Sequence, residues 1–116
     1  MKSSIFFAII FGLLVPLVQV QGHIVWIQNK VVWNTITETS AVIVDNQGKW
    51  NYIDDNRAFS HEGYHLEIPD DIEAFSLVFI VDYRRFEYKM INVKNEGDQC
   101  WHYHGNKYEW EVYPCP

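Results

Sequence analysis

Histidines give this chain most of its capacity for acid–base chemistry near neutral pH, and four of the five fall into two short clusters. In the first cluster, His61 and His65 lie close to Glu62, and a histidine oriented by a glutamate could act as an acid–base pair. Adjacent residues on a strand point in opposite directions, so only a loop could bring these groups together. The pattern therefore favours an exposed polar loop over a catalytic pair.

The second histidine cluster lies near the C-terminus. His102 and His104 are two residues apart on a predicted strand, so their side chains share a face. With Glu109 or Glu111 across a hairpin they could bind zinc or copper. A metal site needs three or four converging ligands, so an ordinary solvated face is the favoured interpretation. We predict no metal site and no cofactor.

Cys100 and Cys115 are the only cysteines. Strand parity places them on the same side of the predicted hairpin formed by residues 100–104 and 108–115, which a disulfide requires. Trp101, Tyr103 and Trp110 fall on the opposite parity and are expected to face the core. We predict a Cys100–Cys115 disulfide, and closing a loop of that length stabilises a fold by about 3 kcal/mol.

The N-terminal residues predict the compartment. Lys2 is followed by an apolar run over residues 5–18 and by a small residue, Gly22, in the order typical of a signal peptide. We predict a signal peptide over residues 1–22 and a single secreted, extracellular domain over residues 23–116, monomeric and without membrane contact after cleavage. The leader holds one of the nine basic residues and none of the fifteen acidic ones, so the mature chain is strongly acidic. Such a chain repels nucleic acid unless its cations are concentrated locally.

The mature sequence predicts strands and lacks a long segment with helical periodicity. Short β-branched, aromatic or alternating runs occupy residues 24–27, 31–36, 41–45, 49–53, 75–81, 85–93, 100–104 and 108–115. Residues 75–81 are apolar on both parities, which predicts a central strand covered on both faces. Residues 54–73 are expected to form a loop with a helical turn near 70–73. The predicted fold is a β-dominated α+β domain: an antiparallel sheet of about five strands, a short helical segment and the disulfide-closed C-terminal hairpin.

Three short motifs resemble one family. They are Phe59-Ser60-His61-Glu62-Gly63-Tyr64, Arg84-Arg85-Phe86 and residues 97–104, which end in Tyr103-His104. Their order resembles the small secreted ribonuclease-like effectors of powdery mildew fungi and, behind them, the fungal guanyl-specific ribonucleases. The resemblance implies that His61 assists catalysis, that Arg85 holds the phosphate and that His104 is the general acid. The matching strand, 75–80, has no carboxylate to act as base, which favours a ribonuclease-like protein without activity.

The sequence thus predicts a secreted, non-catalytic binding protein of the effector type, acting on a host protein, such as an immune receptor, or on RNA. The residues expected to contact the partner are Phe59, Glu62, Tyr64, His65 and Arg84. One alternative is an active secreted endoribonuclease that uses His61, Arg85 and His104. A second alternative is an extracellular metal-binding or structural protein that uses His102, His104 and Glu111.

Overall fold

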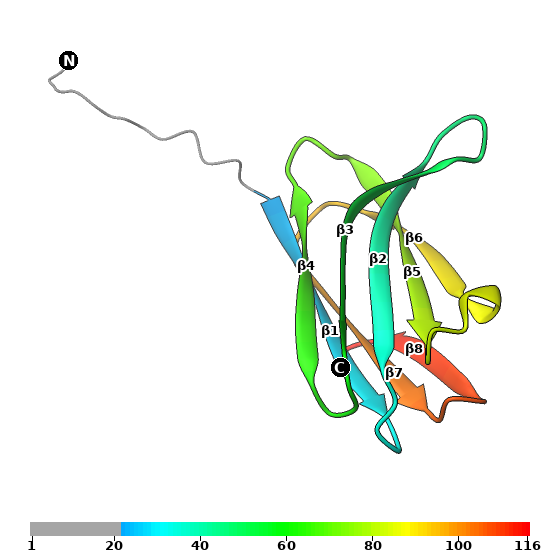
Figure 1. Cartoon of the computed structure of the whole chain (residues 1–116). Helices are drawn as coiled ribbons and strands as arrows, with labels where there is room; N and C mark the ends of the chain where they lie inside the picture. Colours follow the sequence, from blue (N-terminus) through cyan, green and yellow to red (C-terminus); the bar gives the residue numbers. More distant parts are fainter. Residues whose placement is uncertain (1–21) are drawn as a thin grey trace, which may run out of the picture.

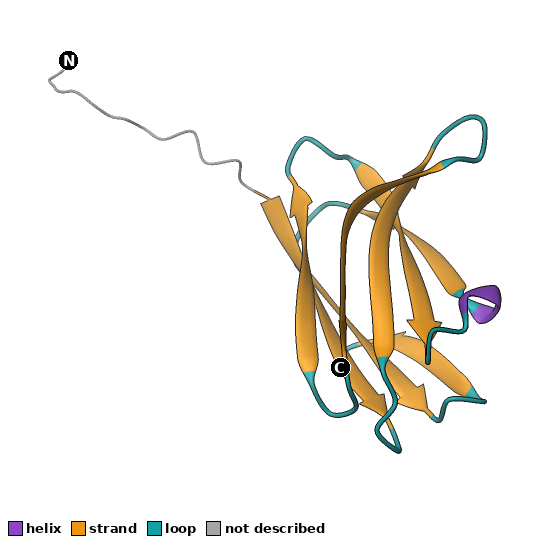
Figure 2. Ribbon diagram, viewed as in Figure 1, coloured by secondary structure: helices purple, strands orange, loops and turns teal. Residues whose placement is uncertain are grey.

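The computed structural model describes residues 22–116, which form a β-sandwich (Figures 1 and 2). The predicted signal peptide lies outside the described residues, apart from Gly22. The strands are β1 (Gly22–Val31), β2 (Thr37–Val44), β3 (Trp50–Ala58), β4 (Gly63–Pro69), β5 (Ala74–Val81), β6 (Lys89–Lys94), β7 (Gln99–Gly105) and β8 (Trp110–Pro114). Over the described part of the chain, no helix is long and apolar enough to cross a membrane.

Two four-stranded sheets make the sandwich, in the orders β4-β1-β7-β8 and β3-β2-β5-β6. All neighbouring strands are antiparallel except β1 and β7, which run parallel with Val31 opposite Gly105. The β-dominated architecture is as predicted. The detail is only roughly matched: there are two sheets instead of one of about five strands, and the helical segment is the three-residue 3-10 helix η2 (Arg85–Glu87).

Alternating side chains explain how the sheets pack. In β1 the residues Val25, Ile27 and Val31 point inward, while their neighbours on the strand face outward. β5 is buried from Phe75 to Val81, because its second face is also covered, partly by Trp50. This confirms the prediction of a central strand covered on both faces.

Hydroxyl groups are built into the core between the sheets. Tyr103 is fully buried, and its hydroxyl lies 2.8 Å from the carbonyl oxygen of Glu38 and 2.9 Å from Oγ1 of Thr39. The hydroxyl of Tyr64 lies 2.8 Å from Oγ1 of Thr37. Burial raises the pKa of Tyr64 to about 12, because the ionised phenol would lose its hydration. These bonds satisfy polar groups that would otherwise destabilise the core.

Residues 54–73 were predicted to form a loop, and this prediction is wrong. β3 continues to Ala58 and β4 occupies Gly63–Pro69. The polar residues of β3 are tolerated because the strand lies at the edge of its sheet with most of its side chains exposed. The predicted strand over 85–93 begins only at Lys89, after η2, and the predicted turn near 70–73 is a short non-helical connection.

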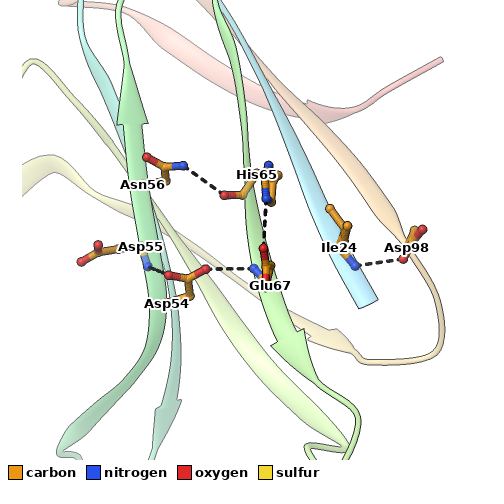
Figure 3. Close-up of polar contacts among 7 residues, drawn as sticks. All are labelled: Ile24, Asp54, Asp55, Asn56, His65, Glu67 and Asp98. Carbon is orange, nitrogen blue, oxygen red and sulfur yellow. Dashed lines mark hydrogen bonds and ion pairs between the residues drawn. The ribbon is translucent and has the colours of Figure 1, made fainter. Parts of the chain in front are cut away.

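Side chains of β3 cover the free edge of β4 (Figure 3). The backbone N–H of Glu67 donates to Oδ2 of Asp54 at 2.9 Å, and Nδ2 of Asn56 donates to the carbonyl of His65 at 3.2 Å. Both strands lie at sheet edges, and an uncovered edge can pair with another chain. The two contacts therefore join the sheets and protect β4.

The C-terminal hairpin has the predicted arrangement. β7 pairs with β8 so that His104 lies opposite Glu111 and Tyr103 opposite Val112. Cys100 and Cys115 form a disulfide with their Cα atoms 5.3 Å apart. Tyr103 and Trp110 are buried on the core side, as their parity predicted.

Candidate functional site

Four connections follow the strands β1, β3, β5 and β7 at one end of the sandwich; three lie toward the bottom of Figure 1, and the one with η2 lies at the right of the view. They comprise residues 32–36, 59–62, 82–88 and 106–109, and together we call them the loop end. Hydrogen bonds join them to one another or to adjoining strands: Val32 N–H donates to the carbonyl of Gly105, and Asp82 N–H donates to that of Ile36. Segments distant in the sequence therefore form one continuous surface.

Large aromatic side chains project from each of these connections. Trp33 is 85% exposed, Tyr108 is 71% exposed and Phe86 is fully exposed. Phe59 and Tyr83 are more than half exposed. Exposed aromatic side chains gathered on one surface mark a binding site more often than scattered ones do.

The backbone of the loop end adopts unusual conformations. All five non-glycine residues with positive φ in the described chain lie here: Trp33, Asn34, His61, Asp82 and Tyr83, with φ between 51° and 70°. Bulky residues such as tryptophan and tyrosine rarely occupy this left-handed region, which costs of order 1–3 kcal/mol per residue. Backbone strain of this kind persists only where surrounding contacts enforce it, and it is concentrated at functional sites.

A buried polar network supplies such contacts for Trp33, Asn34 and His61. Asn29 is 1% exposed, and its Nδ2 donates to the carbonyls of Thr35 and Ala58, each at 3.0 Å. Its Oδ1 accepts from Val31 N–H at 3.0 Å. Thr35 N–H donates to Oγ of Ser60 at 2.8 Å. The connections that carry Trp33 and Phe59 are thereby held in a fixed relative position.

Arginine side chains fix the connection 82–88. The Arg84 guanidinium lies 4.7 Å from the centre of the Tyr108 ring and 3.6 Å from Oε1 of Glu87. Nη2 of Arg85 lies 3.2 Å from Oε1 of Glu38, which is mostly buried in β2. These contacts attach η2 and the connection 106–109 to the sandwich, so the aromatic side chains share a stable support.

Charge is distributed unevenly along the sandwich. The four connections, with two strand residues on either side of each, contain six basic residues (Lys30, Arg57, Arg84, Arg85, Lys89 and Lys107) and six acidic ones (Glu38, Glu62, Asp82, Glu87, Glu109 and Glu111). The rest of the described chain contains two basic and nine acidic residues. The loop end is therefore charge-balanced, and the net negative charge lies elsewhere.

The three residues of the proposed ribonuclease set lie apart. His61 lines a hollow with Lys30, whereas Arg85 lines a different one beside η2. His104 lines a third, with Trp110. Each therefore lies at a separate place around the loop end, and Arg85 is already paired with Glu38.

The residues expected to contact a partner divide into two groups. Phe59, Glu62 and Arg84 belong to the loop end. Tyr64 lies in the core with its hydroxyl bonded, so its side chain does not face a partner. His65 lies on the outer face of β4, with its ring 5.2 Å from that of Trp26.

His102 and His104 form a close pair on the outer face of β7, with ring centres 4.3 Å apart. Nε2 of His102 lies 3.1 Å from the carbonyl oxygen of Pro114, so this nitrogen carries the proton and Nδ1 is left without a partner. Burial and, to a smaller degree, His104 lower the pKa of His102. No group of three potential metal ligands occurs within residues 22–116.

Sequence reasoning missed Trp33, Tyr83, Phe86 and Tyr108 as surface residues. Trp33, Phe86 and Tyr108 fall within predicted strands, and Tyr83 lies between two of them without a predicted role. One usable signal was present: Trp33 precedes Asn34, and asparagine tolerates a left-handed turn better than most residues.

Comparison with known proteins identifies only the fold. No family model and no curated protein matches the chain. The T6SS lipoprotein TssJ1 from Pseudomonas aeruginosa is similar with a TM-score of 0.50 and 8% identity, over 83% of this chain and 98% of that one. This likeness supports the assignment of the chain as a β-sandwich.

Two longer proteins contain a region of similar shape. Listeriolysin O matches with a TM-score of 0.46 and 10% identity over 80% of this chain, and pneumolysin with a TM-score of 0.43 and 6% identity over 82%. The present chain spans only 22% and 23% of those proteins, respectively.

Proposed function

We propose that this protein is a secreted, non-catalytic binding protein of the effector type, which contacts a host component with its loop end. One observation carries the proposal: exposed aromatic side chains project from all four connections, and the connection of Trp33, whose backbone is left-handed, is held in place by the buried network around Asn29. Strain of this kind is concentrated at functional sites.

The composition of the loop end supports a binding role. Tryptophan, tyrosine and arginine are the residues that contribute most binding energy at interfaces, and Trp33, Tyr108 and Arg84 all belong to the loop end, where Arg84 contacts the Tyr108 ring. A surface that is already ordered loses little conformational entropy on binding. The rigid attachment of these connections therefore favours affinity as well as specificity.

Two observations support the absence of ribonuclease activity. Phosphodiester cleavage needs a base, an acid and a cation around one phosphate, and His61, Arg85 and His104 line separate hollows. The cations of the loop end are matched by an equal number of carboxylates, so this surface has no net attraction for RNA. We therefore place RNA below other partners.

Retention on intact eukaryotic cells tests this function. The double variant Trp33→Asn with Phe86→Ser removes two exposed rings, and asparagine can keep the left-handed backbone at position 33. Labelled wild-type protein is expected to stay on washed cells, while this variant is retained at least about tenfold less. The matched control, Tyr52→Ser with Tyr113→Ser, removes exposed tyrosines outside the loop end and is expected to be retained like the wild type.

Equal retention of the loop-end variant and the control would refute the proposal. A parallel assay with single-stranded RNA is expected to show no cleavage. Cleavage that disappears in His104→Ala would instead support the endoribonuclease alternative.

A further inference from the structure

We infer that the host component met by the loop end is the surface of a zwitterionic phospholipid bilayer, such as one of phosphatidylcholine. The inference rests on the proposed function, because it names the partner of the same surface. It departs from the expectation that the mature chain does not contact membranes.

The exposed side chains of the loop end suit the boundary between lipid and water. Trp33 and Tyr108 have large rings with one polar atom, a combination that is enriched at the level of the lipid headgroups. Phe86 is wholly apolar and fully exposed, which is unfavourable in water and favourable in the outer part of the hydrocarbon layer. The three rings belong to connections that contact one another: Val32 N–H donates to the carbonyl of Gly105, and Arg84 contacts the Tyr108 ring.

Cationic side chains beside the rings fit the same environment. The ammonium group of Lys107 lies 5.4 Å from the centre of the Tyr108 ring, and the guanidinium of Arg84 lies 4.7 Å from the centre of the same ring. Long basic side chains can keep their charge at the phosphate level while their apolar stems and neighbouring rings lie deeper. Tyr108 therefore has the surroundings of an interfacial anchor.

The charge distribution selects a zwitterionic bilayer over an anionic one. The loop end carries six basic and six acidic residues, so it is neither attracted to nor repelled by a surface without net charge. Six of the nine other acidic residues lie at the opposite end of the sandwich, beyond the eight-residue strand β2, which spans about 25 Å: Asp45, Asp70, Asp71, Glu73, Glu96 and Asp98. Asp54, Asp55 and Glu67 lie midway along β3 and β4. The length of β2 is about three Debye lengths at physiological salt, so the repulsion of the six far residues from the membrane is screened.

Cosedimentation with vesicles tests the inference. The purified, disulfide-bonded protein is mixed with phosphatidylcholine vesicles at increasing lipid concentration, and tryptophan emission is recorded in parallel. We expect binding that changes less than about twofold between low and physiological salt, because screening acts only on net charge. Trp33→Asn with Phe86→Ser is expected to bind at least about tenfold more weakly, while Tyr52→Ser with Tyr113→Ser binds like the wild type.

A variant with altered fluorescence distinguishes insertion of the Trp33 ring into the bilayer from adhesion of the protein to the vesicle surface. Trp33→Phe keeps an apolar ring, so it is expected to bind the vesicles but to lose most of the blue shift in emission that the wild type shows. Circular dichroism of each variant confirms that the sandwich is folded.

Several results would overturn the inference. They are absence of binding to phosphatidylcholine vesicles, equal binding of the loop-end variant, and binding that requires phosphatidylserine or disappears with salt. If the protein does not bind the vesicles while its retention on cells still depends on Trp33 and Phe86, the partner is another cell-surface component, the lipid inference falls and the proposed function stands. If cell retention is also independent of these residues, both fall.

Discussion

Asn29 is the residue on which the geometry of the loop end depends most. Its amide group donates to the carbonyl of Thr35, in the connection 32–36, and to the carbonyl of Ala58, at the end of β3. Its oxygen accepts from the N–H of Val31 on its own strand. The side chain is almost completely buried, so water cannot replace these bonds. One side chain therefore links the connection that carries Trp33 to the strand that leads into Phe59.

Asn29→Asp tests this role with almost no change in shape. Aspartate keeps an acceptor for Val31 N–H but removes both donors and places a carboxylate against two carbonyl oxygens. We expect the free energy of unfolding to fall by about 2–4 kcal/mol, measured by urea denaturation at neutral pH. The control Gln28→Asp, on the exposed face of the same strand, is expected to change it by less than about 0.5 kcal/mol. Equal effects would contradict the assigned role.

The sequence predicted the contribution of some residues and not of others. Phe59 and Glu62 are predictable as surface residues because they lie in a polar segment. Arg84 is predictable because it is one of two adjacent arginines. Tyr64 was assigned to the same surface, although its strand parity with Leu66 and Ile68 places it inside. Asn29 could not be recognised, since nothing in its neighbours indicates that a buried strand position will need two donors.

At the level of elements, the C-terminal hairpin is held by covalent and apolar contacts at once. The disulfide closes the end of β7 and β8 away from the loop end, while Trp110 packs against Tyr103 with ring centres 5.6 Å apart. The hairpin supplies both the connection 106–109 and one edge of its sheet. Its stability therefore supports the position of Tyr108.

Removal of the disulfide measures its share of that stability. Replacing both Cys100 and Cys115 by serine is expected to lower the free energy of unfolding by about 3 kcal/mol, because a loop of 15 residues is no longer closed in the unfolded chain. Urea unfolding of the wild type with and without reductant should reproduce the difference, and reductant should leave the variant unchanged. An identical midpoint for oxidised and reduced wild type would contradict this account.

Elements with regular patterns were predictable and polar edge elements were not. The runs at 75–81 and 100–104 became β5 and most of β7, because their apolar pattern matches the burial of central strands. β3 was cut short at residue 53, since Asp54, Asp55 and Asn56 are residues that strands usually avoid. β3 pairs with β2 from Trp50 to Ala58, and this pairing overrides the local preference.

The molecule as a whole has two dissimilar ends. One end presents aromatic side chains with balanced charge, and the other carries most of the excess carboxylates. The composition gives the net negative charge but not the separation of balanced charge from excess carboxylates. Along the chain, connections at one end of the sandwich alternate with connections at the other end. The separation follows only from the topology, which collects the connections after β1, β3, β5 and β7 at one end.

Amide hydrogen exchange of the free protein tests most directly whether the loop end is a preformed contact surface. The amides of Val32, Thr35, His61 and Asp82 are hydrogen-bonded although they lie in connections. The account predicts that they exchange at least about a hundredfold more slowly than in an unstructured peptide, at rates near those of the adjoining strands. Exchange of all four at the rates of an unstructured chain would contradict a preformed surface, and with it the proposed function.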